Sequence, residues 1–68
     1  MKVIVFGAGT IGRIFCAEAN DSTEILAVAD NNIKLHNKTL SGHLIISPSL
    51  IPKYSFDKIM IAVSVDIP

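Results

Sequence analysis

Two features are scarce in this chain of 68 residues, and each scarcity excludes a class of protein. The only cysteine is Cys16, so no internal disulfide can form, and a lone thiol is typical of a reducing cytoplasm. The chain also has no net charge, because six basic residues balance six acidic ones, and no basic cluster occurs. This balance argues against nucleic acid and anionic membrane surfaces as partners.

Long hydrophobic runs are absent as well. No apolar run reaches the roughly 18 to 20 residues of a membrane span, and the N-terminus lacks the apolar core and cleavage site of a signal peptide. The sequence therefore predicts an untargeted cytoplasmic protein with no membrane partner.

Apolar residues are plentiful, at 50% of the chain, whereas only 18% of the residues are charged. This composition is richer in Ile and Val than a solvated surface needs, so we expect these residues inside a sheet. A chain this short buries only about 60% of the surface that its unfolded form exposes. The stability margin is therefore small, and we expect the domain to gain support from a partner or from further sequence.

A strand is predicted over residues 2–6, where β-branched and aromatic residues form an unbroken run. An unbroken run, rather than an alternating one, is typical of a strand buried on both faces of a parallel sheet. From Ile11 the apolar period becomes helical, and we predict a helix from about Thr10 to Asn20. The predicted buried face of this helix comprises Ile11, Ile14, Phe15 and Ala19.

A second buried strand is predicted over residues 24–29, which makes a β-α-β unit with its two strands parallel and adjacent. Residues 31–43 are polar and rich in Asn, so we expect a loop with no more than a helical turn, ending in a tight turn at residues 41–42. A short strand of undetermined direction follows at residues 44–46, and a continuous apolar run predicts a last strand at residues 58–63.

These elements predict an α/β fold, namely a truncated Rossmann-type parallel sheet with three to four strands and one main helix. Such a sheet needs helices on both faces, so one face is expected to be uncovered. Two explanations stay open. The chain pairs with a second copy or another partner through that face, or residues 1–68 are a partial dinucleotide-binding domain from the N-terminal part of a longer protein, which we favour.

The segment from Gly7 to Gly12 has the spacing G-x-G-x-x-G between the first strand and the helix. In this motif Gly7 allows the sharp turn, Gly9 lets the backbone approach a pyrophosphate, and Gly12 lets the helix pack against the sheet. The exposed N–H groups and the positive end of the helix dipole then form an anion site that needs no lysine.

Asp30 follows the second strand, 18 residues after Gly12. A carboxylate there accepts hydrogen bonds from the adenosine ribose and repels a 2′-phosphate, so the sequence favours NAD over NADP. The alternative interpretation is that the glycines only make a tight turn and Asp30 only caps the loop that follows it.

Five blocks carry a resemblance to a known family, at residues 7–12 (GAGTIG), 28–31 (VADN), 40–42 (LSG), 45–48 (IISP) and 56–62 (FDKIMIA). Together they resemble the N-terminal Rossmann-type NAD(P)-binding modules of bacterial polysaccharide-biosynthesis proteins. These proteins include nucleotide-sugar dehydratases and epimerases, and similar modules are attached to sugar acyltransferases and methyltransferases. In the acyltransferase relatives the same crevice receives a nucleotide sugar.

The resemblance implies a role for nine residues. The implied pyrophosphate contacts are Gly7, Gly9, Thr10, Ile11 and Gly12. The ribose contacts would be Asp30 and Asn31, and Ala62 and Ser64 would border the cofactor where the last strand meets the first.

Other reactive side chains have simpler interpretations. Cys16 on the helix is interpreted as a packing thiol, and Tyr54 as a packing residue because Lys58, four residues later, starts a strand instead of continuing a helix. His36 and His43 lie seven apart with no companion ligand, so no metal site is predicted and both are expected at the surface.

No residue can be assigned to a chemical step, so whether the chain belongs to an enzyme stays open. Three hypotheses remain: the cofactor domain of an oxidoreductase, dehydratase or epimerase acting on nucleotide sugars; a binding module for a nucleotide sugar without redox chemistry; and a regulatory domain that senses NAD.

Overall fold

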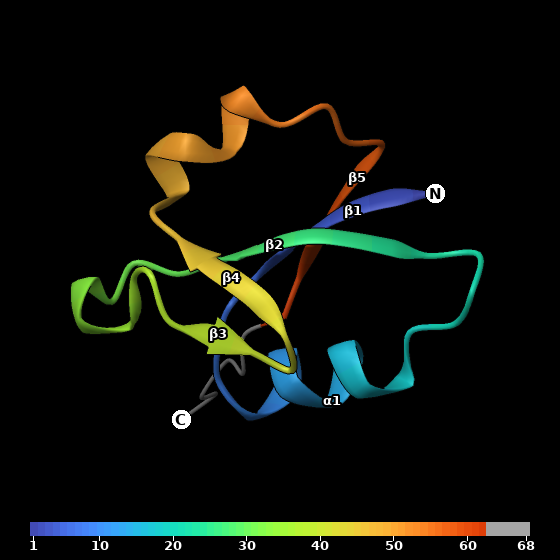
Figure 1. Ribbon diagram of the computed structural model, residues 1–68, viewed down its shortest axis with the longest axis horizontal. Coiled ribbons are helices and arrows are strands. Elements are labelled where there is room, and N and C mark those ends of the chain that lie inside the picture. Colours follow the sequence, from blue (N-terminus) through green and yellow to red (C-terminus); the bar gives the residue numbers. More distant parts are fainter. Residues whose placement is uncertain (63–68) are drawn as a thin grey trace, which may run out of the picture.

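The computed structural model describes residues 1–62, which form a five-stranded sheet in the order β3-β4-β2-β1-β5. In chain order the elements are β1 (Lys2–Phe6), α1 (Thr10–Glu18), β2 (Glu24–Ala29), the 3-10 helix η1 (Ile33–Leu35), β3 (Thr39–Leu40), β4 (His43–Ile46), the 3-10 helix η2 (Pro48–Lys53) and β5 (Lys58–Ile61). Helix α1 lies on one side of the strands and η2 on the other (Figure 1). The fold is therefore a three-layer α/β arrangement with thin outer layers.

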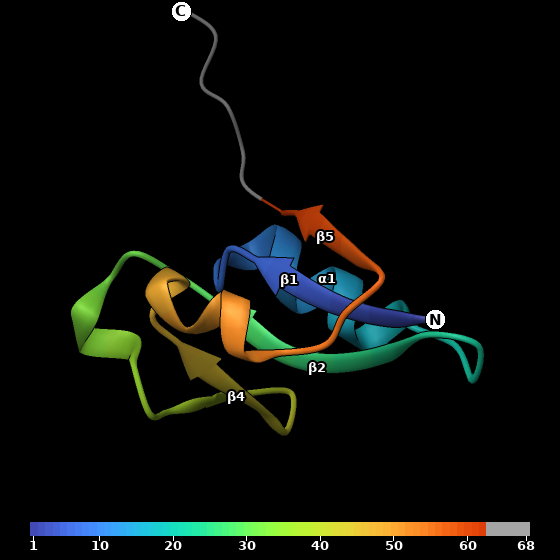
Figure 2. The same cartoon turned by 90° about the horizontal axis from the view of Figure 1, so that it is seen from above.

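Strands β4, β2, β1 and β5 are all parallel, and only β3 runs antiparallel to its neighbour. Figure 2 shows β5 at one edge of the sheet and β4 toward the other. Phe6 pairs with both Ala29 and Ile61, and Ala29 pairs with Ile46. The four parallel strands thus end at the same level, and the segments that follow them meet along one carboxyl edge.

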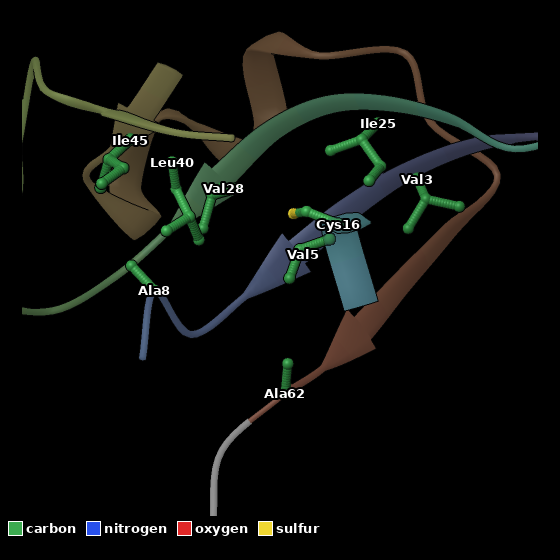
Figure 3. Close-up of a cluster of buried hydrophobic side chains, with 9 residues drawn as sticks. All are labelled: Val3, Val5, Ala8, Cys16, Ile25, Val28, Leu40, Ile45 and Ala62. Carbon is green, nitrogen blue, oxygen red and sulfur yellow. The ribbon is translucent and has the colours of Figure 1, made fainter. Parts of the chain in front are cut away.

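Both faces of the central strands are buried, as the unbroken apolar runs predict. On the α1 side, Val3, Val5 and Val28 pack in one cluster with Cys16 (Figure 3). On the η2 side, a second cluster comprises Ile4, Ala27, Ala29 and Ile46, with Phe6, Leu26, Ile51, Tyr54 and Phe56 packed against it. Alternate residues of the same strand therefore fill two separate cores.

The strands at residues 2–6 and 24–29 are confirmed with the predicted bounds, and the strand predicted at 44–46 begins one residue earlier and runs parallel to β2. The predicted number of strands, three to four, was wrong, because residues 39 and 40 form a fifth. Ser41 and Gly42 both have positive φ, 51° and 82°, which is the geometry of a two-residue hairpin turn. This turn folds β3 back onto β4. The last strand is described as far as Ile61, and position 63 lies outside the described residues.

Helix α1 ends at Glu18, two residues before the predicted end, and its predicted buried face was wrong in part. Ile11 and Ile14 are 43% and 50% exposed, whereas the buried helix residues are Gly12 and Cys16. Only Phe15 and Ala19 of the predicted face pack against the core. The close contact of Gly12 with β1, described below, rotates the helix so that the 12/16 side faces the sheet.

The edge strand β5 is the least covered part of the sheet. Ile59, Met60 and Ile61 are 40%, 39% and 63% exposed. Ile59 and Ile61 pair with Ile4 and Phe6, so they lie on the face of the sheet that η2 covers elsewhere. Within the described residues, no helix has the length and hydropathy needed to cross a bilayer.

Candidate functional site

The glycine loop, Asp30 and Ala62 are brought together by backbone hydrogen bonds at the carboxyl edge. The Gly7 N–H donates to the Ala29 carbonyl at 2.7 Å, and the Ala62 N–H donates to the Phe6 carbonyl at 2.8 Å. Ala62 is buried beside the end of β1 (Figure 3). Of the predicted site, the structure therefore gathers the loop, the acidic residue and Ala62 on one edge, while Ser64 lies outside the described residues.

Gly7 and Gly12 form the inner wall of the loop, the side that faces β1. Gly7 has a φ of 120°, a left-handed conformation that favours glycine, and this turn leads the chain from β1 into α1. A Cβ on Gly12 would lie 1.9 Å from the Gly7 carbonyl oxygen. Both glycines are buried and both are required by the protein's own packing.

Gly9 and the first turn of α1 form the outer rim of the loop, and here the constraint is different. Gly9 has an ordinary φ of −86°, and a Cβ built on it would meet no atom of residues 1–62 within 4 Å. Gly9, Thr10 and Ile11 are all exposed. Nothing in the described residues requires position 9 to be glycine.

The N-terminus of α1 leaves backbone donors available at this rim. Gly9 is the N-cap, no side chain among the described residues caps the helix by a hydrogen bond, and no acidic residue occupies its first turn. The first intrahelical bond runs from the Arg13 N–H to the Gly9 carbonyl at 3.0 Å. The preceding N–H groups of a helix have no intrahelical partner and, with the helix dipole, favour an anion.

Asp30 uses both carboxylate oxygens in hydrogen bonds. Oδ2 accepts from the Ala8 N–H and Oδ1 from the Asn32 N–H, each at 2.8 Å. The Asn32 bond is the loop cap of the alternative interpretation, while the Ala8 bond ties the carboxylate to the glycine loop. A carboxylate has about four acceptor sites, so roughly two remain for a ligand. Asn31, beside it, is exposed.

Two participants were missed from the sequence. Ala8 contributes only its backbone N–H, and no side-chain pattern could have indicated it. His36 was expected at the surface, but it is half-buried, and its Nε2 donates to the Asp30 carbonyl at 2.6 Å. A histidine that contacts a backbone carbonyl six residues earlier leaves no recognisable signature in the sequence.

The other reactive residues lie away from this edge. Cys16 is buried between α1 and the sheet, and burial raises the pKa of its thiol. Tyr54 packs against the core on the opposite face. Like His36, His43 is half-buried rather than at the surface as expected. Among residues 1–62, no three potential metal ligands come together.

A parallel sheet with a glycine loop between β1 and α1, and an acidic residue after β2, defines a Rossmann-like α/β fold. Residues 1–67 match the model of the family described as C2185-like, N-terminal, and the chain belongs to this family. None of the curated proteins matches the sequence.

Among solved structures, the chain is similar in fold to the crystal structure of UDP-D-quinovosamine 4-dehydrogenase from Vibrio fischeri, with a TM-score of 0.75 and 24% identity. The match covers 88% of this chain and 54% of that chain, so this chain spans about half the length of the dehydrogenase. The resemblance to modules of nucleotide-sugar-modifying proteins is thus confirmed at the level of the fold.

Proposed function

We propose that this chain binds NAD at the carboxyl edge of its sheet and serves as the cofactor-binding part of an oxidoreductase, dehydratase or epimerase that acts on a nucleotide sugar. The observation that carries the proposal is the open space over Gly9. The fold does not need a glycine there, whereas a pyrophosphate approaching the helix N-terminus does.

Each part of the site has a role in this proposal. The backbone N–H groups at Gly9, Thr10 and Ile11 hold the pyrophosphate, while Gly7 and Gly12 keep that loop close to β1. The free acceptor sites of Asp30, with Asn31 beside it, bind the adenosine ribose. A carboxylate at this position disfavours the 2′-phosphate of NADP.

The chemistry would be that of the cofactor, since a bound nicotinamide supplies hydride transfer and the protein positions it. Ala62, and Ser64 beyond it, would border the cofactor beside the end of β1. No described residue is given a chemical step. We infer that residues 1–68 are a partial domain of a longer cytoplasmic protein, which the 54% coverage of the dehydrogenase supports.

A second candidate is a nucleotide-sugar-binding module without redox chemistry. The observation in its favour is that the described part of the site offers donors for a pyrophosphate and a carboxylate for a ribose, and a UDP-sugar contains both groups. An NAD-sensing domain that pairs with a second copy would instead use the exposed apolar residues of β5.

Isothermal titration calorimetry with NAD, NADP and UDP-glucose separates these candidates. The proposal predicts saturable NAD binding, with NADP at least about tenfold weaker because of Asp30. Binding of UDP-glucose with no NAD binding at millimolar concentration would contradict it and favour the second candidate. Sedimentation with NAD and with NADH tests the sensing role, which predicts different oligomeric states.

A further inference from the structure

We propose that Asp30 is also a positioning residue for the phosphate-binding loop, and that its carboxylate braces the glycine loop through the Ala8 N–H. This inference rests on the proposed function, because the braced loop is the one assigned to the pyrophosphate. It adds a role that a ribose acceptor alone does not have.

The geometry of the brace joins two segments 22 residues apart. Ala8 lies between Gly7 and Gly9, and its N–H donates to Asp30 Oδ2 at 2.8 Å. The same carboxylate is fixed from its other side, where Oδ1 accepts from the Asn32 N–H. A side chain held at both oxygens is a rigid support for the loop.

The backbone N–H and carbonyl of Asp30 are hydrogen-bonded as well as its carboxylate. Its N–H donates to the Ile46 carbonyl at 3.1 Å, and its own carbonyl accepts from His36 Nε2. Asp30 therefore links the glycine loop both to β4 and to the segment that follows β2. Gly9, which follows Ala8, is held by the helix alone, through the bond from the Arg13 N–H to its carbonyl, so the bond at Ala8 is the one that ties the start of the outer rim to the sheet.

Charge and bracing predict opposite effects on a bound anion. Removing the Asp30 carboxylate takes away a negative charge near the anion site, which by itself would tighten anion binding. Loss of the brace would loosen the loop and weaken the same binding. The sign of the change in affinity for an anion without a ribose therefore separates the two contributions.

The chain offers a matched control at the opposite end of β1. Asp57 Oδ2 accepts from the Lys2 N–H at 2.7 Å, so it too is a carboxylate that binds the backbone of this strand. Asp57→Ala removes the same charge and the same kind of hydrogen bond, but at the amino end of the sheet. It should leave the binding of inorganic pyrophosphate unchanged.

The test measures inorganic pyrophosphate affinity by calorimetry and hydrogen exchange of the Ala8 amide by NMR, in wild type, Asp30→Ala, Asp30→Asn and Asp57→Ala. We expect Asp30→Ala to weaken pyrophosphate binding about three- to tenfold, the equivalent of one hydrogen bond, and to speed exchange at Ala8. Asp30→Asn keeps an acceptor oxygen without the charge, so it should restore slow exchange and bind pyrophosphate at least as tightly as wild type.

Three results would overturn the brace: unchanged Ala8 exchange in Asp30→Ala, pyrophosphate binding in that variant as tight as in wild type, or no recovery in Asp30→Asn. If Asp30→Ala does not fold, faster Ala8 exchange in Asp30→Asn than in wild type overturns it. A wild-type chain that binds neither NAD nor pyrophosphate refutes the proposed function instead, and the amide exchange then decides the brace by itself.

Discussion

The inner wall and the outer rim of the glycine loop belong to one motif but are under two different constraints. At the inner wall, Gly7 turns the chain with a positive φ, and Gly12 meets the Gly7 carbonyl so closely that any side chain would collide. At the outer rim, Gly9 has ordinary backbone angles and open space. The turn and the close packing of the chain explain Gly7 and Gly12. At Gly9 the described residues give only the modest preference of an N-cap for glycine over alanine, and this difference is the basis of the proposed function.

The largest effect on stability is expected at the inner wall, from Gly12→Ala. Its Cβ would lie 1.9 Å from a backbone oxygen, which cannot turn aside as a side chain can. We expect a cost at the upper end of overpacking, about 3 kcal/mol. This exceeds the roughly 1 kcal/mol that alanine gains over glycine inside a helix. Urea unfolding measures the difference, and a variant as stable as wild type would show that the two glycines are not in contact.

A smaller effect, in reactivity rather than folding, is expected at Cys16, which is buried on the same side of α1 as Gly12. Burial raises the pKa of the thiol, so the folded chain holds less of the reactive thiolate at mildly alkaline pH than the unfolded chain does. Alkylation by iodoacetamide should therefore be slower in the folded protein than in urea.

The raised pKa of the Cys16 thiol also predicts how the stability of the fold changes with pH. The folded thiol ionises at higher pH than the unfolded one, so the free energy of unfolding should fall as the pH rises past the unfolded pKa, and level off above the folded pKa. Cys16 is the only cysteine, so the alkylation rate reports on this position alone. Equal rates in the folded and unfolded chains would mean that the helix does not cover the thiol.

The sequence predicted those parts of the fold that depend on short, unbroken apolar runs. The strands at residues 2–6 and 24–29 were found with their observed bounds because both of their faces are buried. The strand at residues 39–40 was missed, because two residues within a polar segment carry no periodic signal and only the turn after them marks the hairpin.

The helix shows why side-chain pattern was not sufficient. Ile11 and Ile14 have the spacing of a buried face, yet the contact at Gly12, a residue without a side chain, decides which face meets the sheet. Hydrophobic periodicity cannot predict a close contact that is possible only because a residue has no Cβ. The shortage of helices predicted an uncovered face of the sheet but could not indicate that β5 would be the most exposed strand.

The candidate site was predicted in its parts but not in its connections. The glycines and Asp30 were identified by spacing, and the structure brings them to one edge. The bond from Ala8 and the bond from His36 involve backbone groups, which every residue has. No sequence pattern therefore distinguishes them. The ligand contacts assigned to the nine predicted residues stay predictions.

The most direct test of the difference between the two sides of the loop is Gly9→Ala, measured for thermal unfolding and for NAD binding by calorimetry. The smallest change in stability is expected here, less than about 1 kcal/mol, because an alanine N-cap is modestly worse than glycine and nothing obstructs the Cβ. NAD affinity should nevertheless fall at least about tenfold, since the methyl group occupies the path of the pyrophosphate. A variant that binds NAD as tightly as wild type would contradict the account.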